Sequence, residues 1–260
     1  MNDSLPDVHA RPDPRALPLP EVGVRGYLAR LAVFDGRTAH GPTSVRLSLG
    51  VSLGGERRGA HLSRFGEAVS SWNERLALAE LPTRAVELAR RLDSEAGVVR
   101  GRFGIVLERR APVSGASGLL EVEAGFEARA HGSERILWQR LFATVQTLCP
   151  CSKEIARAGA HNQRCRVEAS VRTSAGVPYL SILEAIEGAA SCPLFPVLKR
   201  PDEKWVTERA YEKPAFVEDV VRDASLAIGR IEGVLAHRIE AWSEESIHAH
   251  DAYALIERER

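Results

Sequence analysis

The sequence has no surplus of either charge, and it is poor in lysine. Among its 260 residues, 35 Lys and Arg side chains balance 35 Asp and Glu side chains. The lysines are four: Lys153, Lys199, Lys204 and Lys213. A zero net charge excludes a protein that binds nucleic acid or an anionic membrane with its whole surface, although it allows a local basic pocket. We therefore expect neither nucleic acid nor a membrane as a partner.

The sequence also lacks long apolar runs and has few cysteines. Its apolar stretches stay well short of the roughly 18 residues that a transmembrane helix needs, and residues 1–20 contain no apolar core typical of a signal peptide. Four cysteines without a secretory signal indicate a reducing compartment. There, paired cysteines are more often metal ligands or catalytic groups than disulfides. We expect a cytoplasmic protein.

Proline and glycine are too scarce, at 14 and 21 residues, for a disordered or fibrous chain. Five of the prolines fall in residues 1–20, which predicts an extended N-terminal strap. A chain of this length buries enough surface to fold without a disulfide or a structural metal.

Apolar periodicity predicts a repeated order of strands and helices. Strands are expected over residues 22–34, 44–53, 98–110, 119–130, 136–147, 165–173, 234–242 and 251–257, and helices over residues 61–72, 82–92, 179–189, 202–211 and 214–231. This order indicates an α+β protein with antiparallel sheets and helices on one face. It also indicates two β-β-α-α-β-β units, residues 21–132 and 133–260. Exposed sheet edges favour self-association into a barrel-like homo-oligomer.

The densest chemical cluster combines Cys149, Cys151 and His161. On an extended chain the two thiols point to the same side, and His161 follows close enough to fold back on them. Thiolate and imidazole are good ligands for zinc and usable ones for iron or manganese. The alternative interpretation is a pair of small buried residues at a strand end.

A second segment, residues 198–208, places Glu203 beside Lys199 and Arg200. Its charge pattern is typical of an exposed helix start with acidic residues near the positive end of the dipole. The functional alternative makes Glu203 a carboxylate metal ligand and the two basic residues phosphate ligands.

Two further segments near the C-terminus carry candidate groups. Glu218 begins an amphipathic helix and could be an ordinary surface residue. His248 and His250 stand beside three acidic residues, so a role in proton transfer competes with a structural one.

A small basic segment at an expected helix start contains His61, Ser63 and Arg64. Backbone N–H groups, a hydroxyl and a guanidinium together suit a phosphate. The alternative is a solvated helix cap.

Together these segments resemble type IB GTP cyclohydrolase I, the prokaryotic GTP cyclohydrolase family. The resemblance rests on Leu-Cys-Pro-Cys-Ser-Lys-Glu-Ile with Gly-Ala-His-Asn-Gln-Arg, on Leu-Lys-Arg-Pro-Asp-Glu-Lys with Val-Thr-Glu, on Phe-Val-Glu-Asp, on Glu-Ser-Ile-His with His-Asp-Ala-Tyr, and on Gly-Ala-His-Leu-Ser-Arg-Phe. These motifs span nearly the whole chain in the order of the family.

The resemblance implies a tunnelling fold with two units in tandem, assembled as a homotetramer. It also implies a hydrolase acting on cyclic amidines, which converts GTP and water to 7,8-dihydroneopterin triphosphate and formate at the entry to folate and pterin synthesis. One divalent cation per site, zinc, manganese or ferrous iron, would assist.

The resemblance further assigns roles to individual residues. Cys149, His161 and Glu203 match the metal ligands, and Glu218 matches the glutamate that anchors guanine. His248 matches the proton donor and acceptor, while Cys151 would lie beside the metal. The expected triphosphate ligands are His61, Ser63, Arg64, Lys199 and Arg200, some of them from a neighbouring subunit.

Two alternatives remain at this point. An archaeal-type ferrous GTP cyclohydrolase would release a cyclic phosphate product. A non-catalytic purine-binding protein of the same fold would release no formate.

Overall fold

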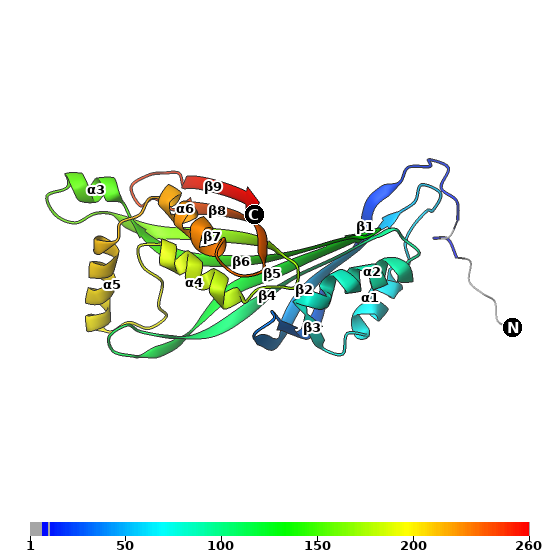
Figure 1. Cartoon of the computed structure of the whole chain (residues 1–260), viewed down its shortest axis with the longest axis horizontal. Helices are drawn as coiled ribbons and strands as arrows, with labels where there is room; N and C mark the ends of the chain where they lie inside the picture. The colour runs from blue at the N-terminus through cyan, green and yellow to red at the C-terminus, as the bar shows by residue number, and fades with distance from the viewer. Residues whose placement is uncertain (1–6, 10, 260) are drawn as a thin grey trace. The chain divides into compact units, whose positions relative to one another are not determined.

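A computed structural model describes residues 7–9 and 11–259 of the chain (Figure 1). The strands are β1 (Leu19–Phe34), β2 (Ala39–Leu53), β3 (Arg75–Ala77), β4 (Ala96–Arg110), β5 (Ser117–His131), β6 (Glu134–Leu148), β7 (Asn162–Thr173), β8 (Val234–Ser243) and β9 (Ala252–Glu259). The helices are α1 (Ser63–Ser70), the 3-10 turn η1 (Leu78–Glu80), α2 (Leu81–Arg91), α3 (Pro150–Ile155), α4 (Tyr179–Ala189), α5 (Arg200–Glu212) and α6 (Val217–Ile228). Every helix and strand expected from periodicity is present, with bounds shifted by a few residues.

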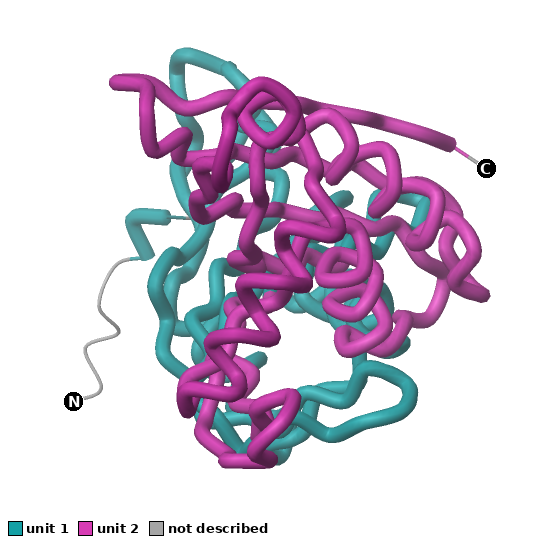
Figure 2. The backbone as a smooth tube through the Cα atoms, turned by 90° about the vertical axis from the view of Figure 1, so that its left-hand side faces the viewer, with its two compact units in different colours: residues 1–103, 125–138 teal, residues 104–124, 139–260 magenta. Residues whose placement is uncertain are grey.

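The chain divides into two compact units, residues 1–103 with 125–138 and residues 104–124 with 139–260 (Figure 2). The nine strands of the described chain pair in the order β3-β1-β2-β4-β5-β6-β7-β8-β9. The units are not contiguous in sequence, because the tip of the β4–β5 hairpin groups with the second unit. The tandem division into residues 21–132 and 133–260 stays a prediction.

In the first unit, β1, β2 and β4 form an antiparallel sheet, and β3 adds in parallel to β1. Alternate residues of β2 are buried, which is the period-2 pattern of a strand with one covered face. Helices α1 and α2 contribute Phe65 and Leu88 to this core. Helix α2 lies so close to β4 that a Cβ at Gly97 would be 2.0 Å from the Ala85 carbonyl oxygen. Glycine is therefore required there.

In the second unit, β7, β8 and β9 are antiparallel neighbours. Helices α4 and α6 contact each other, and α6 contacts β8 and β9, so both cover one face (Figure 1). Ile186 of α4 and Ile228 of α6 are fully buried there. The Ser225 hydroxyl of α6 lies 2.7 Å from Nε2 of His237 on β8. The expected α+β class, with an antiparallel sheet and helices on one face, is confirmed.

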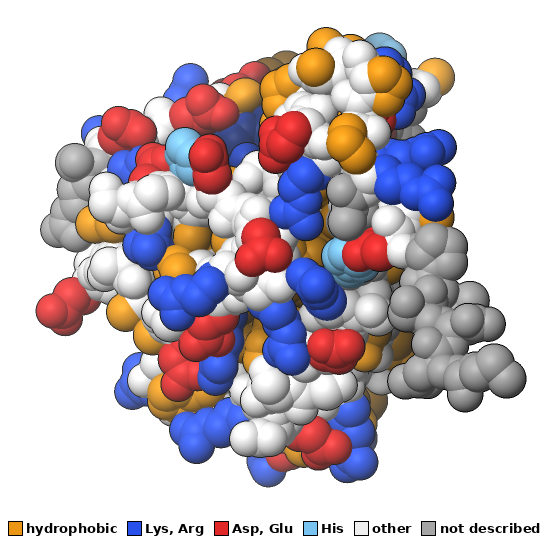
Figure 3. Space-filling model, turned by 90° about the vertical axis from the view of Figure 1, so that its right-hand side faces the viewer, with side chains coloured by type: hydrophobic (Ala, Val, Ile, Leu, Met, Phe, Trp, Pro, Cys, Tyr) orange, Lys and Arg blue, Asp and Glu red, His pale blue; other side chains and the backbone are white. Residues whose placement is uncertain are grey.

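The described part of the N-terminal strap pairs with the loop after β2. The Arg58 N–H donates to the Arg11 carbonyl at 3.1 Å, and Pro12 forms an isolated bridge with Arg57. Residues 1–6 and 10 of the expected strap lie outside the described residues. Acidic and basic side chains are interspersed on the surface in Figure 3, in keeping with the zero net charge. None of the described helices is long and apolar enough to span a bilayer.

Candidate functional site

The first part of the candidate site forms where β6 ends. Cys149 has extended dihedral angles and is the N-cap of α3, whose first residue is Pro150. The missing N–H of proline is tolerated at this first helical position. The Ser152 N–H donates to Sγ of Cys149 at 3.4 Å. The sulfur is therefore held at the start of α3, half-buried, while Cys151 on the same helix is exposed.

His161 lies directly beside Cys149. The Cys149 N–H donates to the His161 carbonyl oxygen at 3.1 Å, and the His161 N–H donates to the Ser152 hydroxyl at 3.2 Å. Gly159, with φ of +73°, makes the turn that returns the chain to this position. The structure thus holds Cys149 and His161, the two residues that the sequence singled out, next to each other through their main chains.

The His161 ring is oriented through Nδ1. This nitrogen lies 2.9 Å from Oε1 of Gln163 and 3.6 Å from a carboxylate oxygen of Glu245. Both neighbours are acceptors, so Nδ1 carries the proton and Nε2 keeps a lone pair for a metal. Gln163 itself donates to Glu245 at 3.3 Å and to Thr147 at 3.2 Å. Sequence reasoning missed Gln163 and Glu245, although both lie inside the motifs.

The two remaining thiols are buried and ionise less readily than a free cysteine. Burial, and secondarily the charge of Glu245, raises the pKa of Cys165 to about 12. Burial also raises the pKa of Cys192 to about 11. Since the thiolate is the form that binds metals and attacks electrophiles, these two residues stay neutral thiols at physiological pH.

Helix α5 carries Glu203, with Lys199 as its N-cap and Arg200 as its first residue. All three side chains are exposed. The beginning of the helix is fixed by Asp202, which is fully buried. One oxygen of Asp202 accepts the N–H groups of Val113 and Ser114 at 2.9 and 2.8 Å.

The other oxygen of Asp202 accepts the Ser114 hydroxyl at 2.6 Å and the Lys199 N–H at 2.8 Å. Burial acts to raise the pKa of Asp202, but these hydrogen bonds outweigh it and hold the pKa well below its usual range. The sequence predicts only a favourable interaction between the acidic residues at this helix start and the helix dipole. The structure shows that one of them, Asp202, also ties α5 to the β4–β5 hairpin.

Helix α5 packs against the segment that bears Cys149. The contact is a small apolar cluster of Leu148, Cys192 and Ala210, with Ala160, Phe195 and Val206 packed around it. The Lys153 ammonium of α3 donates to the Tyr211 carbonyl at 2.5 Å and lies 4.3 Å from the centre of the Tyr211 ring. The relation between α5 and α3 is therefore set by both apolar and polar contacts.

A thiolate, an imidazole and a carboxylate form a donor set that suits zinc. Cys149, His161 and Glu203 do not have their ligand atoms within 4.8 Å of one another. Within residues 7–9 and 11–259, the group of three that meets this distance is Asp7, His9 and His61. Within the described residues, Cys149 and His161 are joined through their main chains, but the three candidate ligand atoms do not form a preassembled group.

Glu218 and His248 are both exposed in the described chain. Glu218 lies in the first turn of α6. His248 lies in the loop between β8 and β9, where its ring stacks on His250 with centroids 5.2 Å apart. Its N–H donates to the carbonyl of Glu245, the residue whose side chain contacts His161. The His248 loop is thereby linked to the His161 network.

The remaining candidate residues belong to the first unit. Ser63 is the exposed first residue of α1, and Arg64 lies 3.6 Å from the Asp93 carboxylate. His61 is half-buried, and its Nε2 lies 3.3 Å from a carboxylate oxygen of Asp7.

Comparison with known proteins gives near-full-length relatives. The chain is 40% identical over 259 residues to a protein of Burkholderia ambifaria, covering 98% of this chain and 95% of that one. It is 37% identical over 257 residues to a protein of Methylococcus capsulatus, covering 99% and 96%. Both relatives are named GTP cyclohydrolase FolE2.

Solved structures confirm the tunnelling fold. Uricase from Arthrobacter globiformis matches with a TM-score of 0.52 at 9% identity, over 92% of this chain and 93% of that chain. Urate oxidase from Bacillus sp. TB-90 matches with a TM-score of 0.52 at 8% identity, over 92% and 99%. At such low identity the likeness concerns the fold alone.

The family model that matches residues 5–254 is described as Type I GTP cyclohydrolase folE2. This description agrees with the GTP cyclohydrolase I family expected from the motifs, and it names the family as folE2 instead of by the subtype IB. The match covers nearly the whole chain, and the relatives agree with it. The chain belongs to the Type I GTP cyclohydrolase folE2 family.

Proposed function

We propose that this chain is a metal-dependent GTP cyclohydrolase that converts GTP and water to 7,8-dihydroneopterin triphosphate and formate. The observation that carries the proposal is the pairing of Cys149 with His161 through a main-chain hydrogen bond of 3.1 Å. In a family named for GTP cyclohydrolase activity, this main-chain contact between two of the three proposed metal ligands supports the proposal. Glu203 is the proposed third ligand.

A divalent cation at Cys149, His161 and Glu203, whether zinc, manganese or ferrous iron, would lower the pKa of a bound water to about 7 and so supply a hydroxide at neutral pH. Gln163 and Glu245 hold the His161 ring with Nε2 free for this role. Cys151, exposed on α3, would lie beside the cation. The nucleophile would add at C8 of the purine, after which the imidazole ring opens and formate leaves.

Glu218 is the proposed anchor for guanine. Its carboxylate can accept both N1–H and N2–H of the base in a charge-assisted pair, which adenine cannot offer. His248 is the proposed proton donor and acceptor for opening the ribose ring. Its exposed position in the β8–β9 loop leaves the imidazole accessible to substrate.

The triphosphate would be bound by basic and hydroxyl groups at two helix starts. These are Lys199 and Arg200 at the start of α5, and His61, Ser63 and Arg64 at the start of α1, some of them from a partner copy. At the second helix start, Nε2 of His61 also lies 3.3 Å from a carboxylate oxygen of Asp7.

We also propose that the chain works as a homotetramer in the cytoplasm. β9 is the last strand in the pairing order, and an edge strand of this kind invites pairing with another copy. A partner copy could then supply groups that the single chain leaves apart, such as a carboxylate near Cys149. Four free cysteines suit a reducing compartment.

The test is to add GTP to metal-stripped protein with zinc, manganese or ferrous ion, and to follow formate and pterin fluorescence. Mass spectrometry of the product should give the triphosphate. A cyclic phosphate would indicate the archaeal-type reaction, and absence of formate with every metal would indicate a purine-binding protein without this activity.

Variants of the three proposed ligands test the metal site itself. Cys149→Ala, His161→Ala and Glu203→Ala should each lower kcat/KM by more than about 100-fold, since loss of a residue that only orients a ligand already costs about 10–100-fold. Glu208→Ala changes an exposed carboxylate of the same helix, which pairs with Lys204, and should retain the wild-type rate. Full activity in any ligand variant would refute the metal site.

A further inference from the structure

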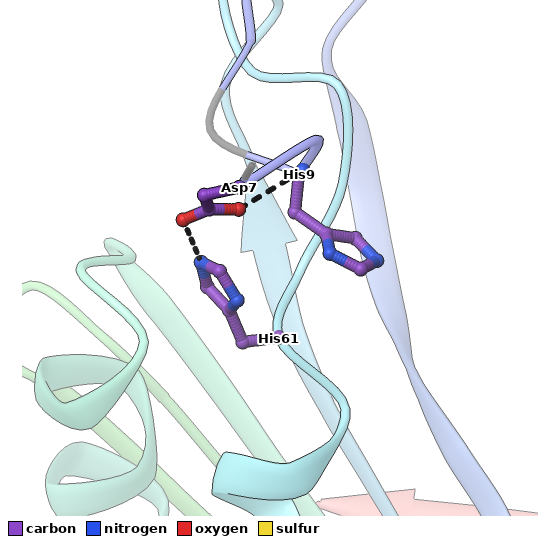
Figure 4. A group of neighbouring side chains, drawn as sticks. All are labelled: Asp7, His9 and His61. Carbon is purple, nitrogen blue, oxygen red and sulfur yellow. Dashed lines mark hydrogen bonds and ion pairs between the residues drawn. The ribbon is translucent and has the colours of Figure 1, made fainter. Parts of the chain in front are cut away.

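A second group of metal-ligating side chains lies at the N-terminal strap, outside the site described above. Asp7 and His9 of the strap and His61 before α1 converge there (Figure 4). One ligand atom of each lies within 4.8 Å of the other two. In the part of the chain that the structure describes, no other three His, Cys, Asp or Glu residues meet this condition.

One interatomic distance in the group matches the distance between two ligand atoms of a bound transition-metal ion. Oδ2 of Asp7 lies 3.3 Å from Nε2 of His61. In a tetrahedral site with metal–ligand distances of about 2.0–2.1 Å, neighbouring ligand atoms are about 3.3–3.4 Å apart. The rings of His9 and His61 have centroids 5.3 Å apart, close enough for both to reach one ion.

Main-chain contacts hold the strap residues in place. Oδ1 of Asp7 accepts the His9 N–H at 3.1 Å, which leaves Oδ2 directed at His61 (Figure 4). The Gly59 N–H donates to the His9 carbonyl at 3.3 Å. A Cβ at position 59 would lie 2.9 Å from Cδ2 of His9, so glycine leaves the room that the imidazole occupies.

We infer that Asp7, His9 and His61 bind a divalent transition-metal ion that links the strap to the segment before α1. Two imidazoles and one carboxylate favour zinc, cobalt, nickel or ferrous ion over magnesium and calcium, which prefer oxygen ligands. Three protein ligands leave positions for water, so the ion is exchangeable. This site is separate from Cys149, His161 and Glu203, and it assigns His61 to a metal instead of the triphosphate.

The test measures how many Co²⁺ ions bind to each chain of metal-stripped, full-length protein. Equilibrium dialysis should give one more bound Co²⁺ per chain in the wild type than in His9→Gln or Asp7→Asn. The affinity of this extra site should fall more than about tenfold in both variants, since even the loss of a residue that only orients a ligand costs about 10–100-fold. His131→Gln is the matched control, because His131 is an exposed histidine outside the group.

Equal stoichiometry and affinity in the wild type, His131→Gln and His9→Gln would overturn the assignment. Hydrogen exchange adds a second readout: peptides containing residues 8–13 should be protected by added zinc in the wild type and in His131→Gln, but not in His9→Gln. Zinc-dependent protection that persists in His9→Gln would count against the site. Because His9 and Asp7 have no proposed part in catalysis, both variants should keep the GTP cyclohydrolase rate.

Discussion

Nδ1 of His161 lies 2.9 Å from Oε1 of Gln163, and the amide of Gln163 is in turn held by Thr147 and Glu245. These contacts fix the ring of the proposed metal ligand on its Nδ1 side and leave Nε2 on the other side. They join the end of β6, the start of β7 and the residues after β8 around one imidazole.

Gln163→Leu tests this orientation. The variant should bind zinc about 10–100-fold more weakly, because hydrogen-bond partners of metal-bound histidines contribute affinity of that size. A competing chelator measures the affinity. Asn162→Ala, which removes the exposed neighbouring side chain, is the control and should bind as the wild type does. Unchanged affinity in Gln163→Leu would show that the ring needs no such support.

Asp202→Asn and Asp202→Ala test the attachment of α5. Both should lower the Tm, with the Ala variant lower because Asn keeps one acceptor oxygen for the N–H groups of Val113 and Ser114. Asp223→Asn, at an exposed carboxylate of α6, should leave the Tm unchanged.

The lowered pKa of Asp202 predicts how its contribution to stability depends on pH. A lowered folded-state pKa gives stability that is present above the unfolded value of about 3.9 and is lost as pH falls through the folded value. The Tm difference between the wild type and Asp202→Asn should therefore stay constant from pH 8 to pH 5. A difference that disappears within this range would contradict a carboxylate with a low pKa.

Glu218→Gln tests the guanine anchor. A neutral amide cannot accept both N1–H and N2–H, and a hydrogen bond to a charged group is worth about 1.5–3 kcal/mol. The KM for GTP should rise about 10- to 100-fold, with a smaller change in kcat, in steady-state formate assays. Glu212→Gln at the end of α5 is the control, and an unchanged KM in Glu218→Gln would remove Glu218 from the substrate site.

His237 should make stability depend on pH near neutrality. Burial, and secondarily the charge of Arg258, lowers the pKa of this imidazole. Its contribution is therefore present above the unfolded value of about 6.5 and is lost as pH falls through the lowered folded value. The urea midpoint of metal-stripped wild type should drop between pH 7.5 and pH 5.5.

The same drop should be smaller in His237→Asn, which carries no titrating group at this position. His131→Gln, at an exposed histidine, should follow the wild-type curve. Parallel curves for wild type and His237→Asn would assign the pH dependence to other groups.

The fold was predictable because its signals are local. Val45, Leu47 and Leu49 alternate with more exposed residues along β2, and this period-2 pattern specifies a strand with one buried face. Leu81, Ala85 and Leu88 recur at helical spacing in α2 in the same way.

The supporting contacts of the candidate site were not predictable, because they join residues far apart in sequence. Asp202 bonds to Ser114 across 88 positions, and Gln163 bonds to Glu245 across 82. Cys149 and His161 were found as candidates because both sit in one short segment. The meeting of Asp7 with His61 depends on the path of the strap, which composition alone does not specify.

The lysines on and around α5 make that helix a target for reagents that modify amines. Lys199, Lys204 and Lys213 lie on it or at its ends, and Lys153 contacts its Tyr211. Lys199 and Lys204 are exposed, whereas Lys213 donates to the Gly188 carbonyl and Lys153 to that of Tyr211. An acylating reagent would therefore modify side-chain amines first at the proposed substrate-binding end of α5. The protection of Lys199 by bound GTP could then be read by peptide mass, without introducing any label by mutation.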